Sequence, residues 1–388
     1  MLDSWRGICA VMVALYHLGP LGHLYAIPLV GGSFLFVDFF FVLSGFVITH
    51  AYADRIHTWR AAGTFMIRRF GRLWPLHFLM LSAFVLLEGT RATLESVLHL
   101  LPSGAPPFSG DLAPNTIVNH ALLMNSWGFE KTLAWNGPSW SIGAEFYTYL
   151  VFAAACVLAH RHLPRVAALT AILAGFLVAM LSPKYMNVTY DYGFIRCLYG
   201  FFVGLVIYKI YLRYHESSLH SVTLSEAAIA CVAIGFVSYA AETPLSLLAP
   251  VFFGALVLVF AFERGRLSRA LSLLPFQKLG TWSYSIYMVH AFVLSVVDHT
   301  VRQVEKFTGH SYHAEAAGLG VLSFGNAFVD DVFALAYICV VVGVASLTYR
   351  LIEIPGRRFF NSLASSLSAE SVPMVAKGFA DTASTTPE

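Results

Sequence analysis

The sequence predicts an all-α protein: a polytopic transmembrane helical bundle of about ten spans with both termini in the cytoplasm. Three observations predict it. Of the 388 residues, 57% are hydrophobic, 15% aromatic and 12% charged, and the mean hydropathy is +0.68, which leaves too little polar surface for a soluble globule. Apolar stretches of about 20 residues, the length that crosses a bilayer as a helix, recur along the chain. Basic residues gather in alternate connections between these stretches.

The predicted spans follow these apolar stretches in order. We place them at residues 5–24, 34–53, 73–90, 137–159, 166–182, 192–209, 224–242, 245–262, 279–299 and 332–353. The second, SFLFVDFFFVLSGFVITHAY, is among the clearest, and the pair within 224–262 is the least clearly divided. Pro244 lies between these two, where a helix is expected to end. The first stretch lacks a small-residue cleavage pattern, so we interpret it as a retained span and not as a signal peptide.

The distribution of Lys and Arg sets the predicted orientation. With a cytoplasmic N-terminus, 18 of the 24 basic residues fall on the cytoplasmic side. The outer side keeps six: Arg91, Lys131, Lys184, Arg196, Arg302 and Lys306. This asymmetry favours an even number of spans with both termini inside. The formal net charge of +2 does not point to nucleic acid, and the expected partners begin with membrane lipids.

The first span, LDSWRGICAVMVALYHLG, contains two ionisable side chains, Arg6 and His17. Their eleven-residue separation is close to three helical turns, so they fall on one face, about 16 Å apart along the axis. Charged groups in a membrane helix usually face a protein interior or a watery cavity, because burying charge in hydrocarbon is costly. The pair therefore marks a candidate reaction or transport path. The alternative is a membrane-anchoring arginine and a histidine bonded to a neighbouring carbonyl.

The motif RRFGRLWP places Arg69 and Arg72 three residues apart at the start of the third span. At that spacing they share a helix face and can both point at one anionic group, with Arg68 turned away. Guanidinium groups bind phosphates through charge-assisted, often bidentate hydrogen bonds. The pair is therefore a candidate phosphate site, and plain anchoring at a cytoplasmic helix end is the alternative.

The motif NGPSWSIGAEFYTYL opens the fourth span. Pro138 suits the first turn of a helix, and Ser141 and Glu145 then stand one turn apart on one face. A glutamate inside an apolar span must be protonated, paired or facing water, which indicates a buried polar site shared between helices. Asp38, in VDFFFVLSGF, is another intramembrane carboxylate. For both carboxylates the alternative is a structural ion pair that locks helices together.

Two predicted outer connections, 91–136 and 300–331, are long for a compact chain. They are candidates for covering an outward-facing acceptor site, or else are flexible linkers. We assign residues 1–360 to the membrane domain and the Ser-, Ala- and Thr-rich residues 361–388 to a disordered cytoplasmic tail. The five cysteines occupy unrelated positions in predicted spans, so we interpret them as small apolar core residues and expect no metal site.

Six blocks occur in order from about residue 2 to 360: LDSWRG with His17, VDFFFVLSGFVI, RRFGRLWP, NGPSWSIGAEFY, LGTWSYSIYMVH and YRLIEIP. Together they resemble the signature of the acyltransferase 3 family, membrane enzymes that O-acylate bacterial cell-surface and secreted glycans. The resemblance implies about ten helices that pass an acyl group to a sugar hydroxyl, commonly acetyl from acetyl-CoA on the cytoplasmic side. The family's functional positions fall on Arg6 and His17, on Arg69 and Arg72 (its RxxR motif), and on Ser141 and Glu145.

The chemistry of acyl transfer suggests a role for each group. A neutral sugar alcohol is a poor nucleophile, so its attack on a thioester needs a base. His17 suits this role because an unperturbed histidine has a pKa of about 6.5. We therefore assign His17 as the general base, with an acyl-histidine intermediate as a variant. Arg69 and Arg72 would hold the phosphates of CoA, and Arg6 would contribute to the same vestibule.

The remaining polar residues receive supporting roles. Glu145 would orient His17 or the acceptor, and Ser141 and Trp140 would shape the pocket. Asp38 is assigned to substrate binding, with the structural ion pair as its alternative. His290 and Glu353 also match family positions, but we interpret them as structural first, because polar residues commonly cap a helix or pair with another group.

Other functions are compatible with buried Arg, His, Asp and Glu in a ten-span protein. A transporter or exporter of a sugar or lipid-linked substrate would use such groups as a proton or substrate pathway. A structural subunit of a polysaccharide synthase would not need His17. The order of the blocks favours the acyltransferase. By analogy with the family, we expect the protein in the bacterial inner membrane. The expected partners are a glycan or lipid-linked sugar acceptor and polysaccharide biosynthesis proteins.

Overall fold

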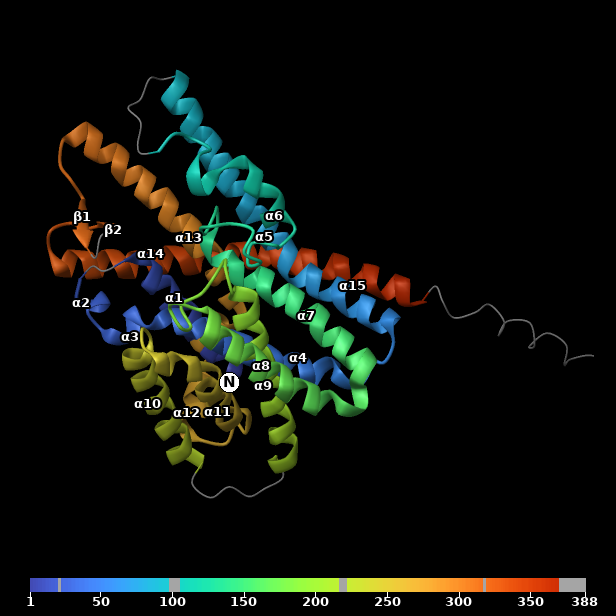
Figure 1. Ribbon diagram of the computed structural model, residues 1–388. Coiled ribbons are helices and arrows are strands. Elements are labelled where there is room, and N and C mark those ends of the chain that lie inside the picture. The colour runs from blue at the N-terminus through green and yellow to red at the C-terminus, as the bar shows by residue number, and fades with distance from the viewer. Residues whose placement is uncertain (20–21, 98–104, 216–221, 317–318, 370–388) are drawn as a thin grey trace, which may run out of the picture.

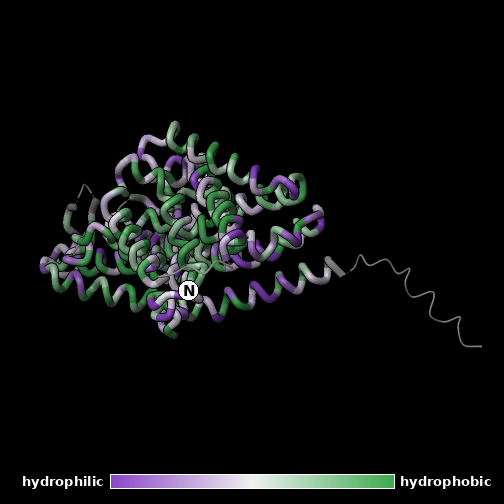
Figure 2. Tube along the Cα trace, turned by 90° about the horizontal axis from the view of Figure 1, so that it is seen from below, coloured by the Kyte–Doolittle hydropathy of each residue, from purple (hydrophilic) through white to green (hydrophobic). Residues whose placement is uncertain are grey.

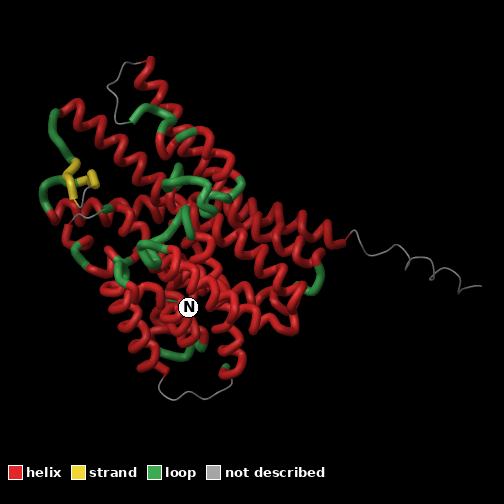
Figure 3. The backbone as a smooth tube through the Cα atoms, in the orientation of Figure 1, coloured by secondary structure: helices red, strands yellow, loops and turns green. Residues whose placement is uncertain are grey.

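A computed structural model describes residues 1–19, 22–97, 105–215, 222–316 and 319–369. The regular secondary structure of the described chain is helical apart from one short two-stranded hairpin, and loops connect these elements, as Figure 3 shows. The longer helices are α1 (Leu2–Leu18), α4 (Phe36–Tyr52), α5 (Trp59–Val97), α7 (Trp140–Ala159), α8 (Leu163–Leu181), α9 (Gly193–Tyr214), α10 (Val222–Ala240), α11 (Ala249–Ala261), α13 (Leu274–Thr308), α14 (Ala327–Thr348) and α15 (Ile354–Ala369). The short ones are α2 (Gly22–Tyr25), α3 (Pro28–Gly31), α6 (Ile117–Ala121) and α12 (Arg266–Leu271).

The all-α prediction is confirmed, and each of the ten predicted spans overlaps one of the longer helices. Seven helical stretches in the described chain are long and apolar enough to cross a membrane: Ser33–Arg55, Trp59–Val97, Gly137–Leu181, Gly193–Tyr214, Thr223–Ala240, Pro244–Ala261 and Ala327–Leu367. Apolar positions dominate the bundle, with polar residues concentrated toward helix ends and along α15 (Figure 2). The protein is thus a multi-pass membrane protein, whereas ten spans and two cytoplasmic termini stay predictions.

Two helices run well beyond the apolar stretches that predicted them. The third predicted span, 73–90, lies inside the 39-residue helix α5, and the ninth, 279–299, lies inside the 35-residue helix α13. Good helix formers such as Arg, Glu and Lys continue a helix after its apolar part has ended. The two long connections that were predicted on the outer side are partly ordered: one contains α6, and the other contains the hairpin of β1 (His313–Ala316) and β2 (Leu319–Leu322).

Helices α1 and α13 run parallel to each other and pack with their backbones in close contact. A Cβ atom added to Gly7 would lie 2.5 Å from the backbone nitrogen of Gly280, which no side chain tolerates. The absence of side chains at these two positions therefore lets the backbones touch. The same two helices meet again further along, where the ring of His17 lies against the ring of His290. Arg6 and His17 are thus both set against α13.

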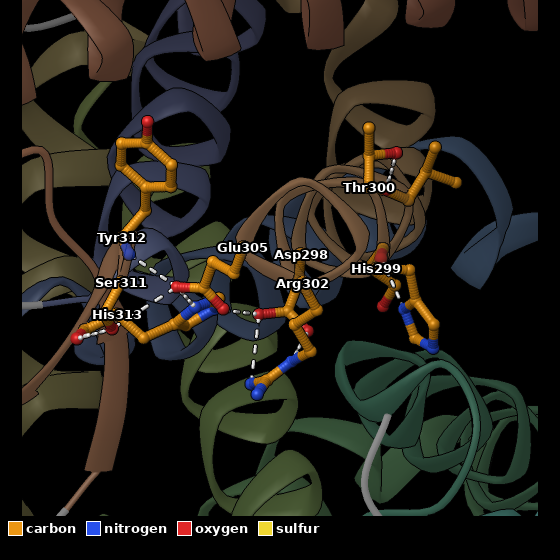
Figure 4. Close-up of polar contacts among 10 residues, drawn as sticks. Asp298, His299, Thr300, Arg302, Glu305, Ser311, Tyr312 and His313 are labelled. Carbon is orange, nitrogen blue, oxygen red and sulfur yellow. Dashed lines mark hydrogen bonds and ion pairs between the residues drawn. The ribbon is translucent and has the colours of Figure 1, made fainter. Parts of the chain in front are cut away.

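The hairpin is attached to the C-terminal part of α13 by a charged cluster (Figure 4). The imidazole of His313 lies between two carboxylates, with Nε2 2.9 Å from Asp298 and Nδ1 2.8 Å from Glu305. Arg302 donates a hydrogen bond of 2.8 Å to Asp298. Burial would raise the pKa of Glu305, but hydrogen bonds from His313 and from the Tyr312 backbone outweigh it, so this pKa lies below its ordinary 4.5.

Helix α14 continues through the π-helical turn η8 (Tyr349–Glu353) into α15, which packs along the first turns of α5 (Figure 1). The boundary predicted at residue 360 between domain and tail falls inside α15, which extends to Ala369. Residues 370–388 of the predicted tail lie outside the described residues. Cys9, Cys156 and Cys197 are buried, as expected of core residues, but Cys231 and Cys339 are exposed, because helix faces turned to lipid accept the same small apolar side chains.

Candidate active site

A cavity of about 140 Å³ lies where α1, α4, α5, α7 and α13 meet. Five of the eight site residues predicted from the sequence line it: Arg6, Arg69, Arg72, Ser141 and Glu145. The lining also includes three residues of α13 to which the sequence analysis assigned no role: Ser283, Tyr284 and Tyr287. The other predicted residues, His17, Trp140 and Asp38, lie outside the lining. The cavity is thus a positively charged site whose lining has one carboxylate, built from five helices of which α1 and α13 are the furthest apart in sequence.

Arg6 lies in the first third of α1 and is held by α13. Its Nε donates a hydrogen bond of 2.7 Å to Ser283, and one Nη donates to the carbonyl of Gly280 at 3.3 Å. The same Nη lies 3.1 Å from the exposed carboxylate of Asp3. Since the close approach of the two helices fixes both acceptors, the guanidinium of Arg6 is oriented toward the cavity by backbone packing.

Arg72 forms a buried ion pair with Glu353, the last residue of η8. The other oxygen of Glu353 accepts a hydrogen bond of 3.0 Å from Ser285, so the carboxylate ties α5 to α13. The Arg72 guanidinium also lies over the ring of Tyr284, 5.3 Å from its centroid. Glu353, which we interpreted as structural first, therefore holds a residue of the cavity wall. The π-helical turn supplies this geometry, and such turns occur frequently at functional sites.

Arg69 differs from the other two arginines in its partners. Its guanidinium lies over Tyr52, 5.2 Å from the ring centroid, and donates a 3.2 Å hydrogen bond to the Tyr52 hydroxyl. Its buried Nε has no hydrogen-bond partner, and among the described residues no carboxylate pairs with it. Glu145, in the same cavity, accepts a hydrogen bond of 2.5 Å from Tyr149. Arg69 therefore presents a positive charge that the described part of the chain does not neutralise with an ion pair.

Ser141 and Tyr287 join α7 to α13 at the cavity wall. The Ser141 hydroxyl donates to the Tyr287 hydroxyl at 2.8 Å, and the Tyr287 hydroxyl donates to the carbonyl of Pro138 at 3.0 Å. The ring of Tyr287 packs edge-on against His290, with 5.7 Å between the ring centroids. The SYSIYMVH block carries a signal that the sequence analysis missed, because Tyr284, Tyr287 and His290 recur every three residues and so share a helix face.

His17 lies beyond Tyr287, with its ring 4.9 Å from the ring of His290. Its Nδ1 is 2.8 Å from the carbonyl oxygen of Val13, one turn earlier in α1. A carbonyl only accepts hydrogen bonds, so Nδ1 must carry the proton and Nε2 of the neutral ring carries the lone pair. The carbonyl of Val13, and not Glu145, therefore orients this histidine. Glu145 lies with the arginines, and its contact is Tyr149.

Asp38 and Trp140 are placed in a buried architectural contact outside the cavity. Both oxygens of Asp38 accept hydrogen bonds from Arg196, at 2.9 and 2.8 Å, and both residues are fully buried. The Arg196 guanidinium lies over the ring of Trp140, 5.4 Å from its centroid. The partner that the sequence could not assign to Asp38 lies on α9, 158 residues away. The arrangement is the helix-locking ion pair given above as the alternative for Asp38.

Comparisons with known proteins show the family of this chain. The profile described as "Acyltransferase domain" matches residues 2–353. "Protein 2 in picA locus" of Rhizobium radiobacter is 31% identical over 171 residues, 39% of this chain and 80% of that protein. "Acyltransferase MdmB" of Streptomyces mycarofaciens is 31% identical over 118 residues, 30% of this chain and 26% of that protein. No solved structure matches. The chain belongs to the acyltransferase 3 family and is a membrane acyltransferase.

Proposed function

We propose that this protein moves a short acyl group, with acetyl as the first candidate, from acyl-CoA to a hydroxyl of a cell-surface or exported glycan. The observation that carries the proposal is the convergence of Arg6, Arg69 and Arg72 on one cavity whose lining includes a single carboxylate, Glu145. Three guanidinium groups suit the phosphates of CoA, because charge-assisted hydrogen bonds to phosphate are among the strongest that side chains make.

The three arginines would contribute to CoA binding in different ways. Arg72 is already paired with Glu353, and Arg6 is tied to α13, so both are positioned before any ligand arrives. Arg69 has no carboxylate partner among the described residues and is backed by Tyr52. Binding a phosphate to Arg69 therefore breaks no existing ion pair. We expect Arg69 to contribute most of the donor affinity that comes from charge.

His17 is proposed as the general base because its lone pair is on Nε2. During transfer, Nε2 would take the proton of the acceptor hydroxyl while the hydroxyl oxygen attacks the thioester carbonyl. His17 lies outside the cavity that the three arginines line, which favours separate routes of entry for donor and acceptor. The proposed location is the bacterial inner membrane, with donor inside and glycan outside, and glycan biosynthesis proteins as partners.

The proposal is tested by CoA release from acetyl-CoA with the purified, detergent-solubilised protein. A panel of p-nitrophenyl glycosides serves as acceptors, and acetyl-CoA binding is measured separately by calorimetry. We expect release that depends on an acceptor and falls about 10²- to 10⁴-fold in His17→Ala, the usual range for a general base. Acetyl-CoA that neither binds to nor turns over with folded protein would remove the donor assignment and favour the exporter.

A matched pair of variants tests the donor site. Arg69→Gln and Arg68→Gln remove the same charge from neighbouring positions, but only Arg69 lines the cavity. We expect Arg69→Gln to weaken acetyl-CoA binding about 10- to 100-fold, the size of a hydrogen bond to a charged group. Arg68→Gln should bind as wild type does. Equal losses in both variants would mean that general basic charge, and not this site, attracts the donor.

A further inference from the structure

His290 is a buried histidine whose ring has no hydrogen-bond partner on another element. The side chain is completely buried, neither ring nitrogen makes a hydrogen bond of ordinary geometry, and the carbonyls that face the ring belong to Ile286 and Tyr287, one turn earlier in the same helix. The two other fully buried histidines of the described chain, His77 and His120, each bond through the ring, to the His120 carbonyl and to Glu130. Buried polar groups are normally paired, and leaving one unpaired costs stability. An unpaired imidazole at the centre of the bundle therefore calls for an explanation beyond packing.

The position of His290 is fixed although its ring is not hydrogen-bonded. Its backbone carbonyl accepts a 3.0 Å hydrogen bond from Tyr337 of α14. Its ring lies 4.9 Å from that of His17, tilted by 52°, and 5.7 Å from that of Tyr287. These two ring contacts and the backbone hydrogen bond hold the imidazole beside the proposed base. The ring therefore lies where no described side chain forms a hydrogen bond with it.

The two histidines are complementary to one hydroxyl group. Nε2 of His17 carries a lone pair, because Nδ1 donates to Val13. A neutral imidazole always carries one N–H, so His290 has a donor to offer. A hydroxyl can donate its proton to one ring while its oxygen accepts from the other. Since both rings are neutral side chains in an apolar bundle, this pair suits an uncharged alcohol better than an anion.

Resting on the function proposed above, we infer that His290 is a second catalytic residue, which donates a hydrogen bond to the acceptor hydroxyl and holds it against Nε2 of His17. In the transfer step, the O–H bond breaks and its proton passes to His17. The oxygen bonds to the acyl carbon, the carbon–sulfur bond breaks, and CoA leaves as the thiolate, which takes the proton back from His17. His290 keeps its own proton throughout and acts by orienting the nucleophile.

Two reciprocal substitutions separate this role from a packing role. His290→Asn keeps an N–H donor but loses the ring, whereas His290→Phe keeps the aromatic ring but loses the donor. We expect His290→Phe to lower kcat/KM for the acceptor about 10- to 100-fold, in line with losing one preorganised donor. His290→Asn should retain most of the activity. His299→Ala is the matched control, because His299 lies on the same helix but bonds only to its own helix, at the Ser295 carbonyl.

The assay uses the whole purified protein, acetyl-CoA and the most active p-nitrophenyl glycoside, with both KM values, acetyl-CoA binding and the melting temperature recorded. We expect the loss in kcat/KM for the acceptor, and we expect the affinity for acetyl-CoA to stay unchanged. An active Phe variant beside an impaired Asn variant would assign His290 to packing and overturn it. An Asn variant that is folded but as inactive as His17→Ala would also overturn it, because a donor would then not suffice. If the wild type neither binds nor cleaves acetyl-CoA, the proposed function itself fails.

Discussion

Breaking the buried pair of Asp38 and Arg196 should be among the costliest single changes in this protein. Replacing Asp38 by Asn leaves the Arg196 guanidinium without a counter-ion at a position that is only 1% exposed. Removing one partner of a buried ion pair costs about 3–5 kcal/mol, because the remaining charge is neither solvated nor paired. Removing Arg196 also frees the carbonyls of Val188 and Phe34, which accept its other hydrogen bonds at 3.0 and 3.1 Å.

These numbers predict a strong coupling in a double-mutant cycle. Arg196→Met should lose about 1–3 kcal/mol for two carbonyl hydrogen bonds in addition to leaving a buried carboxylate unpaired. The double variant Asp38→Asn with Arg196→Met has no stranded charge, so its loss should be limited to the carbonyl part. We therefore expect the double variant to be more stable than Asp38→Asn, with a coupling of at least about 2 kcal/mol.

The assay is the free energy of unfolding in mixed detergent micelles, with acyl transfer per folded protein measured in parallel. Because Asp38 lies outside the cavity lining, turnover per folded molecule should stay close to wild type. If the losses of stability in the two single variants simply add in the double variant, the explanation by an unpaired buried charge is refuted. A folded Asp38→Asn protein with normal stability but no turnover would instead support the assignment of Asp38 to substrate binding.

Two other predictions follow from the packing and from the hairpin. Gly7→Ala places a Cβ atom 2.5 Å from the Gly280 nitrogen, so we expect the free energy of unfolding to fall by at least about 2 kcal/mol. Gly343→Ala is the control, because its Cβ atom meets no atom within 4 Å, and it should be nearly neutral in the same unfolding assay. Because the pKa of Glu305 is lowered in the folded state, its contribution to stability is present above pH 4.5 and is lost as the pH falls through the folded value. The protection factors of the hairpin amides, which are the intrinsic exchange rates divided by the observed ones, should therefore fall on acidification below pH 4.5. Glu305→Gln, which cannot bind His313 as an anion, should weaken that dependence, and an unchanged response would contradict the prediction.

Local spacing predicted the parts of the site that lie within one helix. Arg69 with Arg72, and Ser141 with Glu145, each depend on a separation of three or four residues, and the structure places all four in one cavity. The apolar stretches likewise indicated where the longer helices lie. Their ends were less predictable, since α5 and α13 continue through polar residues that favour helix without favouring lipid.

Contacts between distant segments could not be read from the sequence. Glu353 pairs with Arg72 across 281 positions, and Arg196 pairs with Asp38 across 158, so no periodicity connects them. The sequence indicated that each carboxylate needed a partner but not which one. The environment of the His290 ring was equally hidden, because only the packing of α1 against α13 shows that no described side chain forms a hydrogen bond with it.

The π-helical turn at 349–353 also sets the rotation of helix α15 about its axis relative to helix α14. Each residue of an α-helix turns the chain by about 100°, so deleting one residue here would rotate α15 by about that angle relative to α14. Phe360, now packed against Gly71 of α5, would then point elsewhere. The same deletion would withdraw the carboxylate of Glu353 from Arg72. The extra residue in this turn thus fixes two contacts at once: the packing of α15 on α5 and the ion pair of Arg72 at the cavity.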